Sequence, residues 1–348
     1  MIARVAGAPP TLGIEPQGTS VRAMGEVAAA ADRAGFDAAW TPELYNRSAT
    51  VTLAEMAART ERCTVGTAIA YGVGRSPLTL AAEARDLDEV SDGRLVLGLG
   101  NGTRRMISDW HGQDPESPAV RMEELVPLLR RLWRLHEEPV HHDGRFYRLH
   151  LEPTGTLLAP LRERIPIYTA GVNPRMVETA GRVADGLLGH ILFTPRYIEE
   201  IVLPAIARGA DRTGRDAADV RIASLVVASV HDDADRARAE AAAQIAFYAS
   251  AKSYAPVLEA GGFGPEGEAI RTAFARADHD AMVAAVTPAM VDAMALAGTP
   301  AEVRAQLPRY AELLDHVILY APSFRVTPER VQENTLALIE HLAPGAPA

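Results

Sequence analysis

The feature that most constrains this chain is a regular alternation of two kinds of run along almost its whole length. Short β-branched or glycine-ended runs recur between stretches that have the apolar spacing of helices. The eight runs are IARVAG at 2–7, GFDAAWT at 35–41, TVGTAIA at 64–70, RLVLGLG at 94–100, IPIYTAG at 165–171, GLLGH at 186–190, VRIASLVVASV at 220–230 and HVILYAP at 316–322. Eight strands that alternate with helices predict an α/β fold, the (β/α)8 or TIM barrel.

Two segments interrupt this alternation. Residues 137–164 contain EEPVHHDGRFYRLHLEP, whose aromatic and β-prone residues predict a hairpin-like insertion after the fourth helix. Residues 250–299 contain GGFGPEGE followed by Ala- and Met-rich helical pieces, and we expect a lid insertion there. No linker divides the chain, so the sequence predicts a single TIM-barrel domain over residues 1–348.

Several helix boundaries can be placed from the residues that favour them. Ser20 is expected to cap a helix that ends at Gly35. Pro77 is expected near the start of a helix that ends at Gly93, and Thr327 before Pro328 is expected to open the last one.

The charge and the cysteine content exclude several functional classes. A formal net charge of -10 provides no basic patch for nucleic acid or for an anionic membrane surface. Cys63 is the single cysteine, so we expect a small core residue and no disulfide or thiolate metal cluster. We see neither a signal peptide nor an apolar run of ~18 residues. A cytoplasmic enzyme with a small-molecule substrate is therefore expected.

The carboxyl ends of the predicted strands, where barrels of this type place their active sites, carry few acids, bases or nucleophiles. Such a set indicates that a cofactor performs the chemistry while the protein supplies shape. The adjacent His141 and His142 would point to opposite faces of an extended segment, and we expect no metal site. The residues at these ends are Glu43, Gly72, Val73, Gly74, Asn101, Gly102, Gly171, Val172, Asn173, His190, Tyr320 and Pro322.

Two glycine motifs follow predicted strands. In LGLGNGTRRM the glycines at 98, 100 and 102 would let a flat or phosphorylated group approach the backbone, or would simply form a glycine-rich turn. In TAGVNPRMVETAG a strand ends at Ala170 and Gly171, and Asn173 opens a helix. Free N–H groups and the helix dipole there favour an anion such as phosphate.

Taken in order, these motifs identify a family. The segments AGFDAAWTPE, TAIAYGVGRSPLTLAAEARDLDEVSDGRLVLGLGNG, IPIYTAGVNPRMVETAGRVADGLLGH, AGTPAEV and DHVILYAPS resemble the luciferase-like flavin- or deazaflavin-dependent oxidoreductases. Within them the chain resembles the branch of methylenetetrahydromethanopterin reductase and other coenzyme F420 enzymes. The resemblance implies a TIM barrel and a homodimer. It also implies a non-prolyl cis peptide bond that supports the cofactor ring, which we predict at Gly72–Val73.

The resemblance also assigns roles to residues. Gly72, Val73, Gly100 and Asn101 would contact the ring or its ribityl chain, and the segment Ala170–Asn173, with Gly171 and Val172, would hold the phosphate. Glu43 matches an acidic position near the ring, although Leu44 stands where relatives often have His. His190 matches a substrate-facing position, or it is a packing residue. His111 reaches the pocket from its loop, or it is a surface residue. These three are the candidate catalytic residues.

The sequence therefore predicts hydride transfer between coenzyme F420 and a small organic substrate. The alternative is an FMN-dependent luciferase-like monooxygenase. A lyase and a non-catalytic ligand-binding barrel are further alternatives. A Schiff-base lyase needs a lysine at a strand end, whereas Lys252, the sole lysine, lies in the predicted lid.

Overall fold

The computed structural model describes residues 9–344, which group into two compact units. Unit 1 comprises residues 1–39, 189–204 and 221–348, and unit 2 comprises residues 40–188 and 205–220. One domain over 1–348 stays a prediction.

Unit 1 contains a parallel sheet in the order β11-β10-β12-β1-β2. Its register pairs Thr11 with His316 and Ala223 with the same histidine, so β12 lies between β1 and β10. The strands are β1 (Thr11–Ile14), β2 (Ala38–Thr41, which runs on into unit 2), β10 (Arg221–Val230), β11 (Ala295–Gly298) and β12 (His316–Tyr320).

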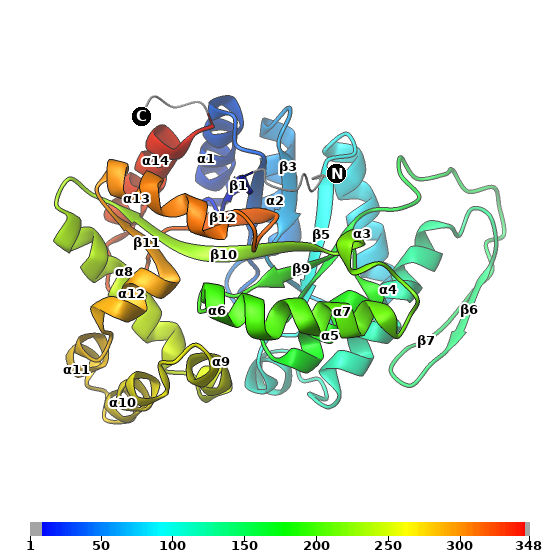
Figure 1. The fold of residues 1–348 in the computed structure, drawn as a ribbon. Coiled ribbons are helices and arrows are strands. Elements are labelled where there is room, and N and C mark those ends of the chain that lie inside the picture. The colour runs from blue at the N-terminus through cyan, green and yellow to red at the C-terminus, as the bar shows by residue number, and fades with distance from the viewer. Residues whose placement is uncertain (1–8, 345–348) are drawn as a thin grey trace. The chain divides into compact units, whose positions relative to one another are not determined.

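The helices of unit 1 fall into two groups. One group accompanies the strands: α1 (Val21–Ala34), α6 (Pro195–Tyr197), η2 (Ile198–Val202), α8 (Ala234–Ala249), α13 (Pro300–Gln306), η5 (Leu307–Tyr310) and α14 (Pro328–Leu342). The other group lies within residues 250–299: η4 (Lys252–Tyr254), α9 (Ala255–Ala260), α10 (Gly264–Ala275), α11 (His279–Ala284) and α12 (Pro288–Met294). The yellow helices of Figure 1 show this second group clustered next to α8.

Unit 2 contains further parallel strands, among which β5 pairs with β3, β4 and β8, and β8 pairs with β9. Its strands are β3 (Thr64–Thr67), β4 (Ala70–Tyr71), β5 (Leu95–Gly100), β8 (Ile167–Ala170) and β9 (Gly186–Gly189). Its helices are α2 (Ala49–Arg59), α3 (Pro77–Val90), η1 (Met106–Trp110), α4 (Pro118–Trp133), α5 (Pro174–Val183), α7 (Leu203–Asp211, which begins in unit 1) and η3 (Ala217–Asp219).

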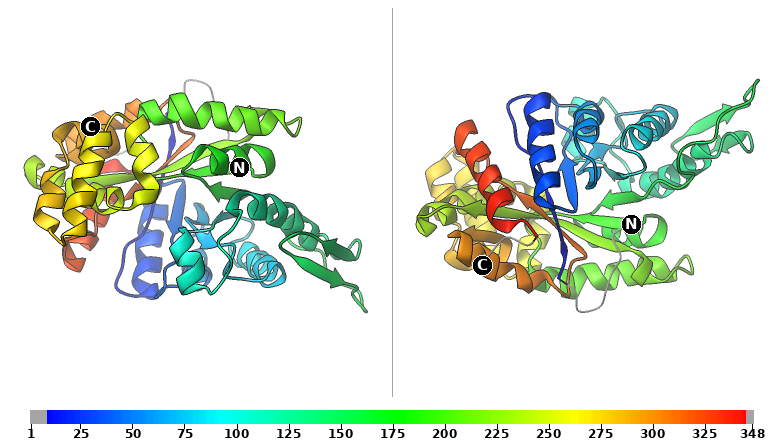
Figure 2. Two further views of the ribbon diagram at one scale, coloured as in Figure 1. Left: turned by 90° about the horizontal axis from the view of Figure 1, so that it is seen from below. Right: turned by 90° about the horizontal axis from the view of Figure 1, so that it is seen from above.

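An antiparallel pair lies within residues 137–164, where a hairpin-like insertion was predicted. Strands β6 (Val140–Asp143) and β7 (Arg148–Leu151) pair with His141 opposite His150. In Figures 1 and 2 this pair projects away from the parallel strands of unit 2.

The alternation of strands and helices follows the predicted fold class. Parallel strands β1, β2, β3 with β4, β5, β8, β9, β10 and β12 alternate with helices in the order of a (β/α)8 barrel. The first strand differs from the prediction. The run at 2–7 lies outside the described residues, and the strand begins instead at Thr11. Strand β11 is an unpredicted addition that pairs in parallel with the end of β10.

Local signals in the sequence place the helix boundaries. Ser20 Oγ accepts a hydrogen bond from the N–H of Ala23, and the helix ends at Gly35, whose φ of 94° suits a residue without a Cβ. Ser76 caps α3 before Pro77, and Thr327 caps α14 in the same way before Pro328. Among residues 9–344 we find no helix with the length and apolar character that crossing a membrane requires.

Candidate active site

The backbone bends between β3 and β4, at a cis peptide bond that joins Ala68 and Ile69. The predicted cis bond between Gly72 and Val73 is therefore wrong, because that bond is trans and the cis bond lies earlier in the same strand exit. Two backbone hydrogen bonds hold the bend against β2 and the residues after it. The Ala68 N–H donates to Thr41 O at 2.9 Å, and the Glu43 N–H donates to Ile69 O at 3.0 Å.

Glu43 secures the loop that follows this bend. Its Oε2 accepts from the Tyr71 N–H at 2.8 Å and from Arg75 Nη1 at 2.7 Å, and its Oε1 accepts from Arg75 Nη2 at 2.6 Å. Arg75 also pairs with Glu83 at 2.8 Å. Burial would raise the pKa of Glu43, but the hydrogen bonds from Arg75 and Tyr71 outweigh it and hold the pKa below its ordinary value. Glu43 is thus an ionised clamp, and this arrangement does not suit a proton donor.

His111 lies against the same loop. Its ring centroid is 5.0 Å from that of Tyr71 in an edge-on arrangement. A Cβ at Gly74 would lie 2.9 Å from the imidazole, so the second glycine of the YGVG segment allows this histidine to pack closely. The structure therefore brings His111 and Glu43 to one loop, residues 71–75.

Two glycines of the LGLGNG segment, at 98 and 100, lie against neighbouring residues. A Cβ at Gly98 would lie 1.7 Å from Thr67 O, and a Cβ at Gly100 would lie 2.2 Å from the Ile69 side chain. Thr67 Oγ1 additionally donates to Gly98 O at 2.7 Å. The neighbouring strand and the bend fill the space where a Cβ would lie at these two glycines, so the glycines allow close strand packing.

Asn101 and the start of α5 lie at the ends of the next two strands. The buried Asn101 donates from Nδ2 to Pro118 O at 3.2 Å, which ties the end of β5 to the start of α4. The loop from Ala170 through Gly171 and Val172 leads from β8 into α5. Asn173 caps this helix by accepting from the Met176 N–H at 3.0 Å. The cap uses the Met176 N–H, and Pro174 has no N–H, so fewer first-turn donors remain for an anion.

His190 follows β9 and packs among tyrosines in unit 1. Its ring stacks on Tyr254 with centroids 4.3 Å apart and meets Tyr248 edge-on at 4.9 Å. Its Nδ1 accepts from the Leu192 N–H at 3.3 Å, which places the ring proton of the neutral tautomer on Nε2. Burial lowers the pKa of His190 to about 3, so the ring is a neutral hydrogen-bond donor at physiological pH.

Glu15 is a site residue that the sequence analysis missed. It directly follows β1, its side chain is 2 % exposed, and its Oε1 accepts from Gln17 Nε2 at 3.2 Å. Burial raises its pKa to about 8, against the lowering effect of the Gln17 hydrogen bond. The signal was the sequence GIEPQG, an acid at a strand end. It was overlooked because the first strand was assigned to residues 2–7.

Three tyrosines complete this cluster of neutral groups in unit 1. Burial raises the pKa of Tyr254 and of Tyr320 to about 12, and it raises that of Tyr248 well above its ordinary value. The Tyr320 hydroxyl lies 3.2 Å from Ser323 Oγ. The cluster therefore presents hydroxyl and carboxyl groups that keep their protons at neutral pH.

Other histidines of unit 2 lie close to carboxylates or to one another. His142 Nε2 lies 2.9 Å from Glu124 Oε1, and His141 stacks on His150 across the hairpin, so the two neighbouring histidines have different partners. His136, Glu137 and Glu163 place potential ligand atoms within 4.8 Å of one another. Arg134 Nε already donates to Glu137 at 2.7 Å, and the side chain of Glu163 is exposed.

Residues 5–316 match the model of the luciferase-like monooxygenase family. The chain belongs to this family. It is 33% identical over 288 residues to 5,10-methylenetetrahydromethanopterin reductase of Methanolobus tindarius, which covers 82% of this chain and 84% of the relative. This relationship confirms the resemblance drawn from the sequence.

Solved structures of two proteins share the fold with this luciferase-like chain. The coenzyme F420 dependent tetrahydromethanopterin reductase of Methanopyrus kandleri has a TM-score of 0.75 at 23% identity, covering 93% of this chain and 96% of its own. A type II Baeyer–Villiger monooxygenase of Pseudomonas putida, in complex with FMN, has a TM-score of 0.68 at 16% identity. The match covers 98% of this chain and 99% of the monooxygenase chain. The predicted (β/α)8 barrel is confirmed.

Several polar atoms of unit 2 fit a ring cofactor in this family member. Within residues 9–344, the buried side-chain atoms without a hydrogen-bond partner include Thr41 Oγ1, Asn101 Oδ1 and Thr169 Oγ1, which lie at or just after strand ends, and His111 Nε2, which lies in the loop after η1. Buried polar atoms without partners are rare and require a specific explanation. A heteroaromatic ring with carbonyl and N–H groups offers the kind of partners that such atoms need.

Proposed function

We propose that this protein transfers a hydride between coenzyme F420 and a small uncharged organic substrate. The observation that carries the proposal is the buried acid Glu15 among tyrosines, a set of proton-bearing groups that suits a neutral oxygen or nitrogen acceptor. The preference for F420 rests on the methylenetetrahydromethanopterin reductase relative, whose identity to this chain is 33%.

The cofactor would be held by residues of unit 2. The bend at Ala68–Ile69 and the clamped loop, with Gly72 and Val73, would support the ring, and Gly100 and Asn101 would lie near the ribityl chain. The segment from Ala170 to Asn173 would receive the phosphate at the start of α5. When bound, reduced F420 supplies a hydride.

The remaining work falls to groups that hold or donate protons. Glu15 keeps its proton at neutral pH and can give it to a substrate atom that becomes basic after reduction. His190 Nε2–H and the tyrosine hydroxyls can orient a carbonyl or imine. In the described structure none of the hydrogen bonds of Glu15, His190 and the three tyrosines comes from an arginine or a lysine, so no cation is already held there to pair with a substrate carboxylate or phosphate. An uncharged substrate is favoured for this reason.

The second candidate is an FMN-dependent monooxygenase. It is favoured by the shared fold of the FMN-bound Baeyer–Villiger enzyme, whose TM-score to this chain is 0.68. A reduced flavin reacts with oxygen, whereas a deazaflavin carries carbon in place of the reactive nitrogen and does not. The two candidates therefore differ in the cofactor and in whether oxygen takes part in the reaction.

A binding titration separates these two functions. The purified protein is titrated with F420 and, separately, with FMN, while quenching of cofactor fluorescence is followed. We expect F420 to bind at least ten times more tightly than FMN, and tighter binding of FMN would overturn the proposal in favour of the monooxygenase. Reduced F420 is then mixed with uncharged ketones and with matched keto acids. Faster oxidation by the keto acids would contradict the neutral substrate class. A cytoplasmic homodimer stays a prediction.

A further inference from the structure

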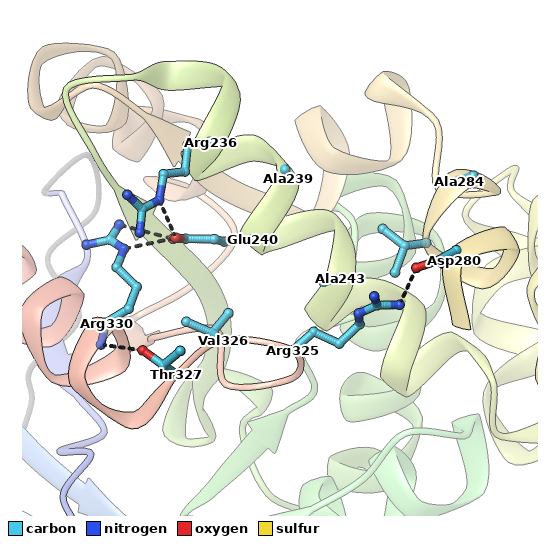
Figure 3. A pocket seen from close by; sticks show the side chains of 11 residues that line it. Arg236, Ala239, Glu240, Ala243, Asp280, Ala284, Arg325, Val326, Thr327 and Arg330 are labelled. Carbon is cyan, nitrogen blue, oxygen red and sulfur yellow. Dashed lines mark hydrogen bonds and ion pairs between the residues drawn. The ribbon is translucent and has the colours of Figure 1, made fainter. Parts of the chain in front are cut away.

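A pocket of about 600 Å³ lies within unit 1 between α8, α11 and the segment that leads into α14 (Figure 3). That volume is typical of small-molecule sites. The residues that line it include three arginines from separate segments: Arg236 of α8, Arg325 from the segment before α14, and Arg330 of α14. Alanines and valines from α8 and α11 supply much of the remaining wall.

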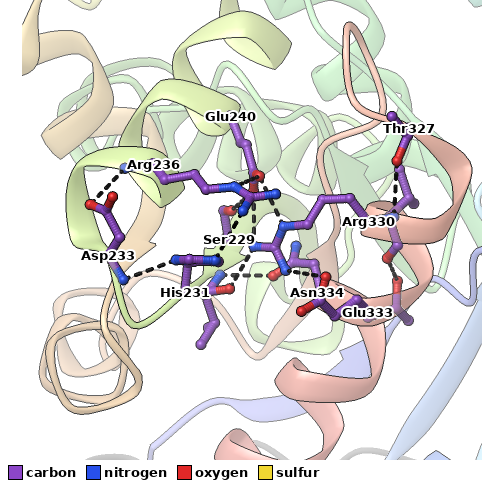
Figure 4. Close-up of polar contacts among 12 residues, drawn as sticks. Ser229, His231, Asp233, Arg236, Glu240, Thr327, Arg330, Glu333 and Asn334 are labelled. Atoms are coloured by element: carbon purple, nitrogen blue, oxygen red, sulfur yellow. Dashed lines mark hydrogen bonds and ion pairs between the residues drawn. The ribbon is translucent and has the colours of Figure 1, made fainter.

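Arg330 is the fixed part of this pocket. Its side chain is 7% exposed, and its Nε and Nη2 donate to the two carboxylate oxygens of Glu240 at 2.9 and 3.0 Å. Nη2 also donates to Val230 O at 2.8 Å, and Ser229 Oγ donates to the same carboxylate (Figure 4). Glu240 is thus fully engaged at the base of the pocket and has little capacity to hold a further cation.

Arg236 is held much less firmly. His231 Nδ1 accepts from the Asp233 N–H at 2.9 Å, so the ring proton lies on Nε2. Arg236 Nη1 lies 3.2 Å from that same Nε2, and two donors therefore face each other (Figure 4). The other interaction of the Arg236 side chain is an ion pair from Nε to Glu240 Oε1 at 3.3 Å. The Glu240 carboxylate also accepts hydrogen bonds from Arg330. The guanidinium of Arg236 is therefore available for an acceptor that enters the pocket.

The guanidinium of Arg325 is also available for an acceptor, because its ion pair is exposed. Its partner Asp280 lies 2.7 Å away, but the side chains of the two residues are 43% and 88% exposed. Exposed ion pairs of this kind contribute little to stability, so an incoming anion can compete for the guanidinium. The lining carries three guanidinium groups against two carboxylates, Glu240 and Asp280, and Arg330 also pairs at 3.6 Å with Glu333, which lies outside the lining.

We propose that this pocket binds a small organic anion, with a phosphate or carboxylate head between Arg236 and Arg325 and a compact apolar body against the alanine and valine wall. Guanidinium groups match both kinds of head through paired hydrogen bonds. The site is separate from the residues proposed to hold F420, and it does not rest on the proposed hydride transfer.

Calorimetric titration without F420 tests this proposal with three probes of similar size: phenyl phosphate, benzoate and benzyl alcohol. The variant is the double change Arg236→Gln and Arg325→Gln, both at exposed side chains. The control is Arg238→Gln, which lies on the same helix but pairs with Asp292 and does not line the pocket. Circular dichroism and thermal melting verify that both variants fold.

We expect saturable binding of at least one anionic probe, a loss of tenfold or more in the double variant, and no change in the control. Tighter binding of phenyl phosphate or of benzoate identifies the preferred head group, and either result supports the proposal. Benzyl alcohol should not bind measurably. The proposal is overturned if neither anion binds, if benzyl alcohol binds as well as the anions, or if the double variant binds as tightly as the unaltered protein.

Discussion

Replacing Glu15 by Gln should make the protein more stable at neutral pH and should remove a pH dependence. The folded carboxyl has a pKa of about 8, against an ordinary value of 4.5. Between these two values the folded state keeps a proton that the unfolded state has lost. The free energy of unfolding therefore falls as the pH rises through this window, by ~1.4 kcal/mol for each pH unit.

The size of the effect follows from the burial of this side chain. At pH 7 the ionisation of Glu15 in the unfolded chain lowers the free energy of unfolding by ~3 kcal/mol, and at pH 8 and above by ~5 kcal/mol. A glutamine has no proton to lose, and its carbonyl can still accept from Gln17. The stability difference between the variant and the unaltered protein should therefore widen from pH 5 to pH 8.

Urea unfolding at pH 5, 6, 7 and 8 measures this difference. Glu199→Gln, an exposed position, is the control and should give a constant difference. A constant difference for Glu15→Gln as well would refute the view that this carboxyl is held in its neutral form. The same variant should lose turnover with F420 if Glu15 supplies the proton, so higher stability and lower activity would occur together.

Three further substitutions test the structural roles assigned above. Gly98→Ala places a Cβ 1.7 Å from a backbone oxygen of the neighbouring strand and should cost ~3 kcal/mol in urea unfolding, whereas Gly155→Ala, in open space, should change nothing. Arg75→Met leaves the Glu43 carboxylate without its cationic partner, and it should lower the free energy of unfolding by ~3 kcal/mol and weaken F420 binding tenfold or more. Unchanged affinity for F420 would show that loop 71–75 does not contribute to cofactor binding. Asn173→Ala removes the cap of α5 and should cost ~1 kcal/mol and raise the Kd for F420; an unaltered melting temperature would contradict the capping role.

The sequence by itself determined the fold class, because the fold depends on local patterns that recur along the chain. The alternation of apolar runs with helical spacing identified β2, β3, β5, β8, β9, β10 and β12. Residues such as Ser20, Gly35 and Pro77 placed helix boundaries through their own backbone preferences. Each of these signals acts within a few residues, so it can be interpreted without knowledge of the tertiary structure.

The sequence predicted the cis bond in the correct strand exit but at the wrong bond. Two glycines made Gly72–Val73 the least hindered place for it. The structure has it at Ala68–Ile69, where hydrogen bonds from the neighbouring segment 41–43 hold the chain. Those contacts join residues that are more than twenty positions apart, and no local pattern reports them.

Only the tertiary structure decided the protonation states in the site. Glu43 and Glu15 are both acids at strand ends, and nothing in their sequence neighbours separates them. Arg75 pairs with Glu43 across 32 positions and keeps it ionised, whereas Glu15 is buried without a cation among its hydrogen-bond partners and keeps its proton. The pKa of a carboxyl depends on burial and on charges within a few ångströms, and these distances are fixed only when the chain has folded.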